Sequence, residues 1–252
     1  WPGTLVYSSF PELGGEQNRD AILANQQALR GKFQDAARYG AMPALLWNPM
    51  SLQLAPEGST FEELYAAHPG MQAKPSKFRQ FLCPSDPATR QFLVDGVREI
   101  AQAFPELEWI IPVWSDDGGE LNCGCDRCAQ YPFIDRVVDY TKLLMDTARS
   151  INPHMRFMLH MHALDWFIPE YHPEYANDPT RGLSAVRQRL GNDVEAILNL
   201  VTTPPGMDLQ SWLFGKETTM LGSGVPTFLL FHYYEAGGPG IVAPLSPVQT
   251  HL

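Results

Sequence analysis

The sequence predicts an α/β protein built as a (β/α)8 barrel of the TIM type. Short apolar runs alternate with amphipathic helical segments, and polar and aromatic residues gather just past the ends of the runs. The length of 252 residues also suits one such barrel, which has about 250 residues. We expect a single domain over 1–252. Six strand segments are evident, so the barrel is expected to lack one or two βα units in this chain.

The first part of the chain contains two apolar runs that are short enough for strands. Helical spacing of apolar residues occupies the segments between and after these runs. We expect strands over Leu5 to Phe10 and Pro43 to Asn48. A helix is expected over Asp20 to Tyr39, and a weaker one over Phe61 to Ala67.

A clearer helix signal begins at Cys83-Pro-Ser-Asp-Pro-Ala. Ser85 or Asp86 suits the N-cap, because a short polar side chain accepts a hydrogen bond from a free backbone N–H, and Pro87 suits the first helical position. The stripe that this helix buries is expected to be Leu93, Val97, Ile100 and Phe104. The next expected strand is Trp109 to Trp114.

The second part of the chain continues the alternation. A helix is expected over Phe133 to Ser150, with Val137, Thr141, Leu144 and Ala148 buried. The later expected segments are the strand Arg156 to Ala163, a proline-rich excursion Phe167 to Pro179, a short helix Leu183 to Leu190, and the strands Val194 to Thr202 and Pro226 to Glu235. Apolar strands separated by helices favour a parallel sheet, either open or closed into a barrel. An open Rossmann sheet is disfavoured, because Gly237-Gly238-Pro239-Gly240 leads into no helix.

Composition excludes several classes of partner. The net charge of −10 argues against nucleic acid, since phosphate binding requires clustered Lys and Arg. No apolar run approaches the roughly 20 residues of a membrane span, and no segment is typical of a signal peptide. We therefore expect a soluble protein that binds a small polar substrate and neither nucleic acid nor membrane. The compartment, cytoplasmic or secreted after processing, and the oligomeric state stay open.

All four cysteines of the chain suit one metal site. Cys123, Cys125 and Cys128 form a C-x-C-x2-C motif, and Cys83 precedes a helix upstream. Such short spacings favour a shared ion, and four thiolates complete a tetrahedral zinc site. A pair of disulfides through Cys83 and a reactive thiol are the alternatives. A zinc ion with four thiolate ligands is closed to chemistry, so it would hold the neighbouring loop in place.

Three carboxylates follow the strand that ends at Trp114. Asp116, Asp117 and Glu120 lie in the segment 115–120, called the acidic loop below. In a partly desolvated cleft, neighbouring carboxylates can acquire separate acid and base roles, as glycosidases require. Glu235, at the end of the last expected strand, is a candidate partner. The alternative is that the aspartates cap a turn and that Glu120 faces solvent.

Histidines and aromatic residues also gather at the expected strand ends. His160 and His162 share one side of a strand, and His232 has an equivalent place on the last one, so they suit sugar hydroxyls or a metal ion. Aromatic rings at such ends can stack on sugar rings, although both residue types also serve as packing. The predicted substrate-binding residues are Trp47, Asn48, Trp114, Asp116, His160, His162, Trp166, His232 and Tyr234.

One block of the chain resembles a known group. The order Cys-Pro-Ser-Asp-Pro, a helix, Phe-Pro-Glu-Leu-Glu-Trp-Ile and an acidic loop with C-x-C-x2-C resembles bacterial barrel glycosidases of the α-glucuronidase and hexosaminidase-like superfamily. The resemblance covers about Cys83 to Cys128. It implies a catalytic glutamate shortly after the fourth strand, and the matching position is Glu120 with Asp117 as its neighbour. Glu235 is supported by its strand-end position alone.

The leading hypothesis is a glycoside hydrolase acting on a carbohydrate. Glu120 is the predicted general acid/base, and Glu235 or Asp117 the nucleophile or water-activating base. The sugar, the linkage and the stereochemical outcome are not fixed by the sequence. One alternative is a metal-dependent hydrolase with His160, His162 and Asp117 or His232 at the barrel mouth. The other is a carbohydrate-binding barrel without catalysis.

Overall fold

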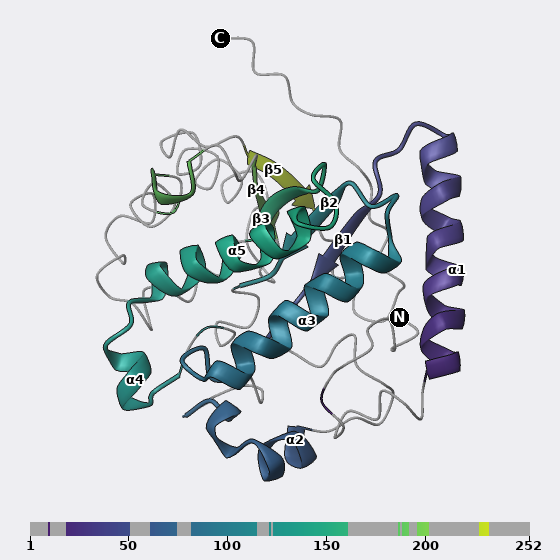
Figure 1. Cartoon of the computed structure of the whole chain (residues 1–252). Helices are drawn as coiled ribbons and strands as arrows, with labels where there is room; N and C mark the ends of the chain where they lie inside the picture. Colours follow the sequence, from purple (N-terminus) through teal and green to yellow (C-terminus); the bar gives the residue numbers. More distant parts are fainter. Residues whose placement is uncertain are drawn as a thin grey trace, which may run out of the picture.

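The computed structural model describes residues 10, 19–50, 61–74, 82–114, 121, 123–160, 186, 188–191, 196–201 and 227–231. Within this part of the chain, five strands form one parallel sheet (Figure 1). The strands are β1 (Ala44–Trp47), β2 (Trp109–Pro112), β3 (Arg156–His160), β4 (Ala196–Val201) and β5 (Thr227–Phe231). Their order in the sheet is the order in the chain, β1-β2-β3-β4-β5.

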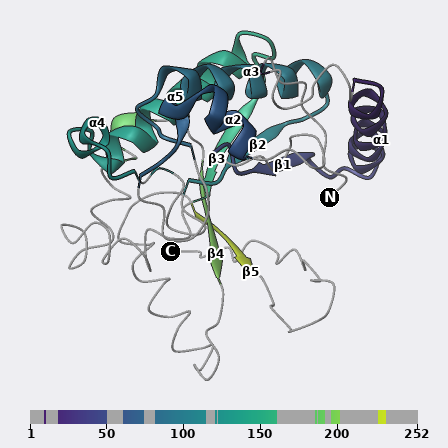
Figure 2. The ribbon, with the colours of Figure 1, turned by 90° about the horizontal axis from the view of Figure 1, so that it is seen from below.

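Helices cover one face of the first strands. The helices are α1 (Arg19–Arg38), α2 (Phe61–Ala67), the short 3₁₀ helix η2 (Pro69–Met71), α3 (Pro87–Ala103), α4 (Asp126–Ala129) and α5 (Phe133–Arg149). Figure 2 shows α3 and α5 together on one side of β1, β2 and β3. No described helix is long and apolar enough to cross a membrane.

Helix α3 forms as its sequence predicts. The Asp86 carboxylate accepts a hydrogen bond of 2.9 Å from the Ala88 N–H, and Pro87 follows at the first helical position. The predicted stripe is fully buried at Leu93, Val97, Ile100 and Phe104. A β-carbon on Gly96 would lie 3.3 Å from the Trp47 ring, so the glycine allows α3 to pack closely on β1.

Helix α5 packs beside α3 on the same face. Its predicted stripe, Val137, Thr141, Leu144 and Ala148, is fully buried. The Trp114 indole N–H donates a hydrogen bond of 3.0 Å to the Thr141 hydroxyl. Because Trp114 follows β2 closely, this bond fixes the carboxyl end of β2 against α5.

The sheet has two apolar faces. Leu45, Ile110 and Phe157 belong to the main core with the helices. Trp109, Ile111 and Met158, which alternate with them along β2 and β3, form a separate apolar cluster on the other face. A sheet that is apolar on both faces is typical of α/β folds.

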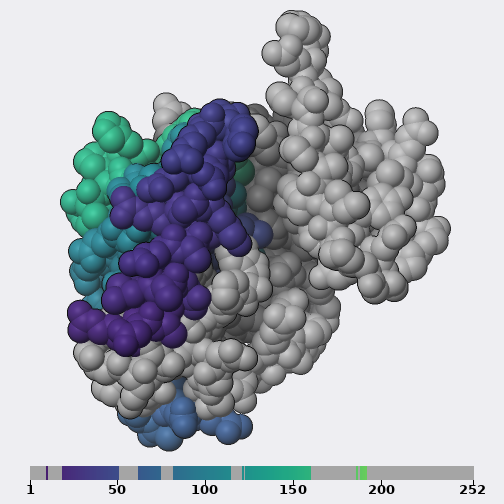
Figure 3. All heavy atoms as spheres, turned by 90° about the vertical axis from the view of Figure 1, so that its right-hand side faces the viewer, coloured from purple at the N-terminus to yellow at the C-terminus, as the bar shows by residue number. Residues whose placement is uncertain are grey.

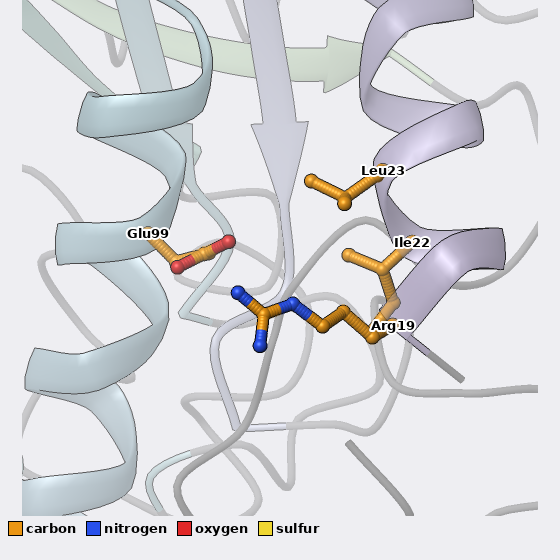
Figure 4. Close-up of a pocket in the computed structure, with 4 residues that line it drawn as sticks. All are labelled: Arg19, Ile22, Leu23 and Glu99. Atoms are coloured by element: carbon orange, nitrogen blue, oxygen red, sulfur yellow. The ribbon is translucent and has the colours of Figure 1, made fainter. Parts of the chain in front are cut away.

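Helix α1 lies at the edge of the helical layer, where it buries Ile22 and Phe33 and also makes polar contacts. Arg30 Nε donates to the Glu106 carboxylate at 2.7 Å, and Gln26 donates to Glu99 of α3 at 2.9 Å. A pocket of about 240 Å³ lies between α1 and α3, with Arg19, Ile22, Leu23 and Glu99 in its lining (Figure 4). Figure 3 shows α1 spread over the surface on this side.

Most of the predicted segments are confirmed within a few residues. The other predicted segments lie wholly or partly outside the described residues. The predicted strand from Leu5 is described only at Phe10, and the proline-rich excursion 167–179 is not described. The predicted short helix is described, as helical, at residues 186 and 188–190. Closure of the sheet into a barrel stays a prediction.

Candidate metal centre

The four cysteines come from two neighbouring connections between strand and helix. Cys83 lies between β1 and α3, whereas Cys123, Cys125 and Cys128 lie between β2 and α5. Because β1 and β2 are adjacent and parallel, both connections leave the same edge of the sheet. The four side chains therefore meet at the carboxyl ends of the strands and form what is called the cysteine cluster below.

The sulfur atoms of the cysteine cluster have the spacing of a metal site. Cys83 Sγ lies 3.6 Å from Cys123 Sγ, 3.8 Å from Cys125 Sγ and 3.8 Å from Cys128 Sγ. All four sulfurs lie within 4.8 Å of one another. Zinc–sulfur bonds of about 2.3 Å in a tetrahedron place sulfurs about 3.8 Å apart, whereas a disulfide bond is about 2.05 Å long. The four cysteines, all free thiols here, therefore fit a shared ion.

Backbone and hydroxyl groups orient the sulfurs. The Cys83 N–H donates to the Met71 carbonyl at 2.6 Å, next to the antiparallel bridge between Gln72 and Leu82. The Lys74 N–H donates to Cys123 Sγ at 3.2 Å, and Ser85 Oγ lies 2.9 Å from Cys128 Sγ. Hydrogen bonds of this kind hold metal ligands in position.

Burial and mutual hydrogen bonds separate the acidities of the thiols. The hydrogen bond from Cys83 lowers the pKa of Cys128 to about 5, against the effect of burial. The same hydrogen bond, together with burial, raises the pKa of Cys83, and burial raises that of Cys123. In the metal-free protein Cys128 is therefore a thiolate at neutral pH, whereas Cys83 and Cys123 must release protons when an ion binds.

Two arginines lie beside the cysteine cluster in different environments. Arg136 of α5 is 6% exposed, and burial lowers its pKa while the nearby Cys128 and Cys123 raise it. Arg127 of α4 is exposed and pairs with Asp86 at 3.4 Å. Positive charge thus approaches the thiols from the buried side and from the surface.

The comparisons with known proteins include a distant structural likeness. The sequence matches no protein-family model and no curated protein. A solved structure of GH36 α-galactosidase AgaA from Geobacillus stearothermophilus aligns with 79% of this chain at 14% identity and a TM-score of 0.40. The match covers 29% of that chain, so this chain spans less than a third of its length. A likeness at this level carries no argument about fold or activity.

The predicted catalytic residues lie outside the described residues. The described chain stops at Trp114 and continues at Leu121, and both side chains are fully buried. The acidic loop is therefore bounded by two core residues, although nothing is described of Asp116, Asp117 or Glu120. The other predicted site residues that are not described are His162, Trp166, His232, Tyr234 and Glu235.

Four predicted substrate-binding residues are described at least in part. Trp47 and Trp114 are 3% and 0% exposed and pack in the main core, which is the packing role that the sequence left as their alternative. Asn48 Oδ1 accepts from the Met50 N–H at 3.1 Å in the turn after β1. His160 ends β3, where its backbone pairs with Leu198. Contact of these residues with a substrate stays a prediction.

Arg136, the buried arginine near the cysteine cluster, is the main residue of this site that sequence reasoning missed. It lies three residues after Phe133 and four before Tyr140, both of which are buried on α5. The sequence did contain a signal for its burial, because a charged residue stands here at the helical spacing of buried residues. The contact between Ser85 and Cys128 was harder to predict from the sequence, because it depends on how α3 packs against α4.

Proposed function

We propose that the cysteine cluster binds one zinc ion whose role is structural. The observation that carries this proposal is the 3.6 to 3.8 Å separation between the Cys83 sulfur and the other three. Four thiolate ligands leave no coordination position for water, so the ion takes no part in catalysis. When bound, it cross-links the β1–α3 connection to the β2–α5 connection.

Metal analysis of the purified protein tests this role. We expect one zinc ion per chain after gel filtration, and its loss in Cys83→Ser. Asp126→Asn is the matched control, because it changes an exposed carboxylate next to the cluster without removing a thiol. Bound iron would replace zinc in the proposal, since four thiolates also suit that metal. Protein that binds neither ion when reconstituted under reducing conditions would overturn it.

We further propose that the chain is a glycoside hydrolase whose carboxylates lie in the acidic loop. Trp114 anchors one end of this loop in the core, and Leu121 and the cysteine cluster lie at its other end. The loop follows a strand of a parallel sheet at its carboxyl end, where barrel enzymes carry their active sites. Closure of the described strands into a barrel is part of the same proposal.

In this function Glu120 gives a proton to the departing glycosidic oxygen. A second carboxylate, Asp117 or Glu235, attacks the anomeric carbon or activates a water molecule. The ionised partner and the protonated Glu120 need different environments, because burial and neighbouring charges set the pKa of a carboxyl group. The carbohydrate is the proposed partner, with the remaining predicted side chains as its contacts.

Turnover of aryl glycosides and aryl glycuronides tests the hydrolase. Glu120→Gln is expected to abolish turnover of any substrate that the wild type cleaves, while the fold and the zinc content stay unchanged. Glu62→Gln, an exposed carboxylate on α2, is the matched control. Sugar binding without turnover would favour a non-catalytic binding barrel. More than one bound metal ion per chain would favour the metal-dependent hydrolase.

A further inference from the structure

A pocket of about 450 Å³ lies where the start of α3 meets α4 and α5. Its lining includes Arg90 of α3, Arg127 of α4 and Tyr140 of α5, together with Asp86 and Tyr131 from the adjoining turns. It is called the arginine pocket below. None of these residues belongs to the predicted catalytic or substrate-binding set, so the pocket is a separate feature of the surface.

Contacts within the protein hold the aromatic side of the pocket in place. Tyr140 is 2% exposed, and its hydroxyl donates to the Pro84 carbonyl. Its ring also lies against that of Trp114, with the ring centres 6.1 Å apart. The Tyr131 hydroxyl donates to the Asp139 carboxylate at 2.6 Å. Both tyrosines therefore have partners inside the chain, and the pocket is preformed.

Arg90 is the uncompensated cation of the pocket. It is exposed, and within the described part of the chain it forms no ion pair. Burial raises the pKa of Tyr131 and of Tyr140, and the charge of Arg90 lowers both, so its guanidinium lies near the two hydroxyl groups. The charge of this arginine therefore reaches into the pocket.

Arg127, in contrast, already has negative neighbours. Its Nη2 lies 3.4 Å from Asp86 Oδ2, and the same carboxylate caps α3. Arg127 also interacts electrostatically with Cys83 and Cys125 of the cysteine cluster. The negative groups beside the pocket thus act on Arg127, while Arg90 keeps its full attraction for an anion.

We propose that the arginine pocket binds the oxyanionic group, a carboxylate or a phosphate, of a small molecule that carries a ring. The N–H groups of a guanidinium match such an oxyanion in a planar, bidentate geometry. Tyr131 and the prolines of the lining, Pro84 and Pro87, offer apolar surface to the ring. The volume of about 450 Å³ also suits a small molecule. This site depends on neither the metal centre nor the hydrolase activity.

Titration calorimetry at low ionic strength tests the pocket with phenyl phosphate, benzoate and benzyl alcohol, which share a ring and differ in charge. Both anions are expected to bind saturably, and benzyl alcohol at least about tenfold more weakly, because it forms no charge-assisted hydrogen bond with both partners ionised. Tighter binding of phenyl phosphate would assign the pocket to phosphorylated ligands, and tighter binding of benzoate to carboxylates. If neither anion binds, or if benzyl alcohol binds equally well, the proposal is overturned.

Removal of an arginine locates the binding. Arg90→Gln is expected to weaken binding of the tighter anion by about tenfold or more, the loss usual for a hydrogen bond to a charged group. Arg98→Gln is the matched control, because it changes an exposed arginine of the same helix that pairs with Asp95. Its effect should stay below about twofold, since solvent screens that charge. Equal affinities of wild type and Arg90→Gln would place the anion elsewhere and overturn the proposal.

Asp86→Asn separates an anion site from a structural role of the same residues. Asparagine still caps α3, while the negative charge leaves the pocket and Arg127 loses its carboxylate partner. Binding of the tighter anion is therefore expected to strengthen by about threefold or more. A purely structural Asp86 would give no such gain, and unchanged or weaker binding in this variant would contradict the proposed site.

Discussion

The segment at residues 121–128 and the helix α1 are attached to the α3–α5 layer in opposite ways. The first is held by buried thiols and a buried arginine, with Cys83, Cys123 and Cys128 all less than 9% exposed. The second holds no buried charged side chain, and it combines the buried Ile22 and Phe33 with surface contacts such as Arg30 with Glu106, whose side chains are 45% and 22% exposed. Surface ion pairs contribute about 0 to 1 kcal/mol, whereas a structural zinc site contributes about 10 kcal/mol or more in small peptides. We therefore expect the first attachment to weaken when the proposed metal ion is removed, and the polar contacts of the second to weaken as the salt concentration rises.

The largest effect is expected from Cys83→Ser, because Cys83 is the one proposed ligand among the four cysteines that comes from the β1–α3 connection. The free energy of unfolding in the presence of zinc should fall by several kcal/mol, since the cross-link between the two connections is lost. Denaturant unfolding measures this change. In zinc-free buffer the same substitution should cost much less. Equal costs in the two buffers would contradict a metal-bound cluster.

The next largest effect should be the pH dependence of the free energy of unfolding of the metal-free protein. The pKa of Cys128 is about 5 in the folded chain, and an unfolded thiol titrates near 8.5. Between these values the unfolded state binds more protons, so stability should rise with pH by at most about 1.4 kcal/mol per unit. Above the upper value the raised pKa values of Cys83 and Cys123 should reverse the trend.

Urea unfolding in a pH series measures this dependence. Cys128→Ala should remove the rise between pH 5 and 8, because it removes the thiolate that forms only in the folded chain. A rise that persists unchanged in that variant would assign the effect to other groups.

Thr141→Val tests the attachment of Trp114, which lies just before the acidic loop, to helix α5. It should lower the free energy of unfolding by about 1 to 3 kcal/mol, because the Trp114 indole N–H is then buried without its acceptor. Thr147→Val is the matched control on the same helix, since the Thr147 hydroxyl only donates to the Leu143 carbonyl one turn earlier. Thermal or urea unfolding compares the two variants, and similar losses would remove the special role of Trp114.

The smallest effect is expected from Glu106→Gln, which removes the main ion pair of α1. The free energy of unfolding should fall by less than about 1 kcal/mol, and the loss should shrink at high salt. Denaturation at 0.05 M and about 1 M salt measures both values. A loss of several kcal/mol that salt does not change would show that α1 is attached as firmly as the cysteine cluster.

The parts of the fold that sequence reasoning predicted depend on local periodicity. Leu93 and Val97 recur at helical spacing, and Asp86 and Pro87 mark the start of α3, so neighbours in the chain carry the signal. The cysteine motif could also be recognised from neighbouring residues. Which face of a strand packs against the helices was harder to predict, because both faces of this sheet are apolar. Trp47 shares its face with Leu45 and packs in the core with the helices, which strand alternation alone did not decide.

The remaining contacts depend on distances between segments remote in sequence. The partners of α1, Glu99 and Glu106, are about 70 residues away and follow from the angle at which the helix docks. The relation between Glu120 and Glu235 is of the same kind, and it stays a prediction. Sequence patterns can therefore name the candidate carboxylates but not the separation that decides a glycosidase mechanism.

The spacing of the cysteine ligands along the chain has a consequence for biosynthesis. Cys83 and Cys123 are 40 residues apart, and all of α3 and β2 lies between them. An ion captured early by the C-x-C-x2-C segment would keep a labile fourth position, because closing so long a loop in a disordered chain is entropically unfavourable. Cys83 would reach the proposed ion only when β2 has docked beside β1. Complete coordination by the proposed ion would thus require that the β1–α3–β2 unit has been assembled, and a lack of metal during translation would leave this unit without its cross-link.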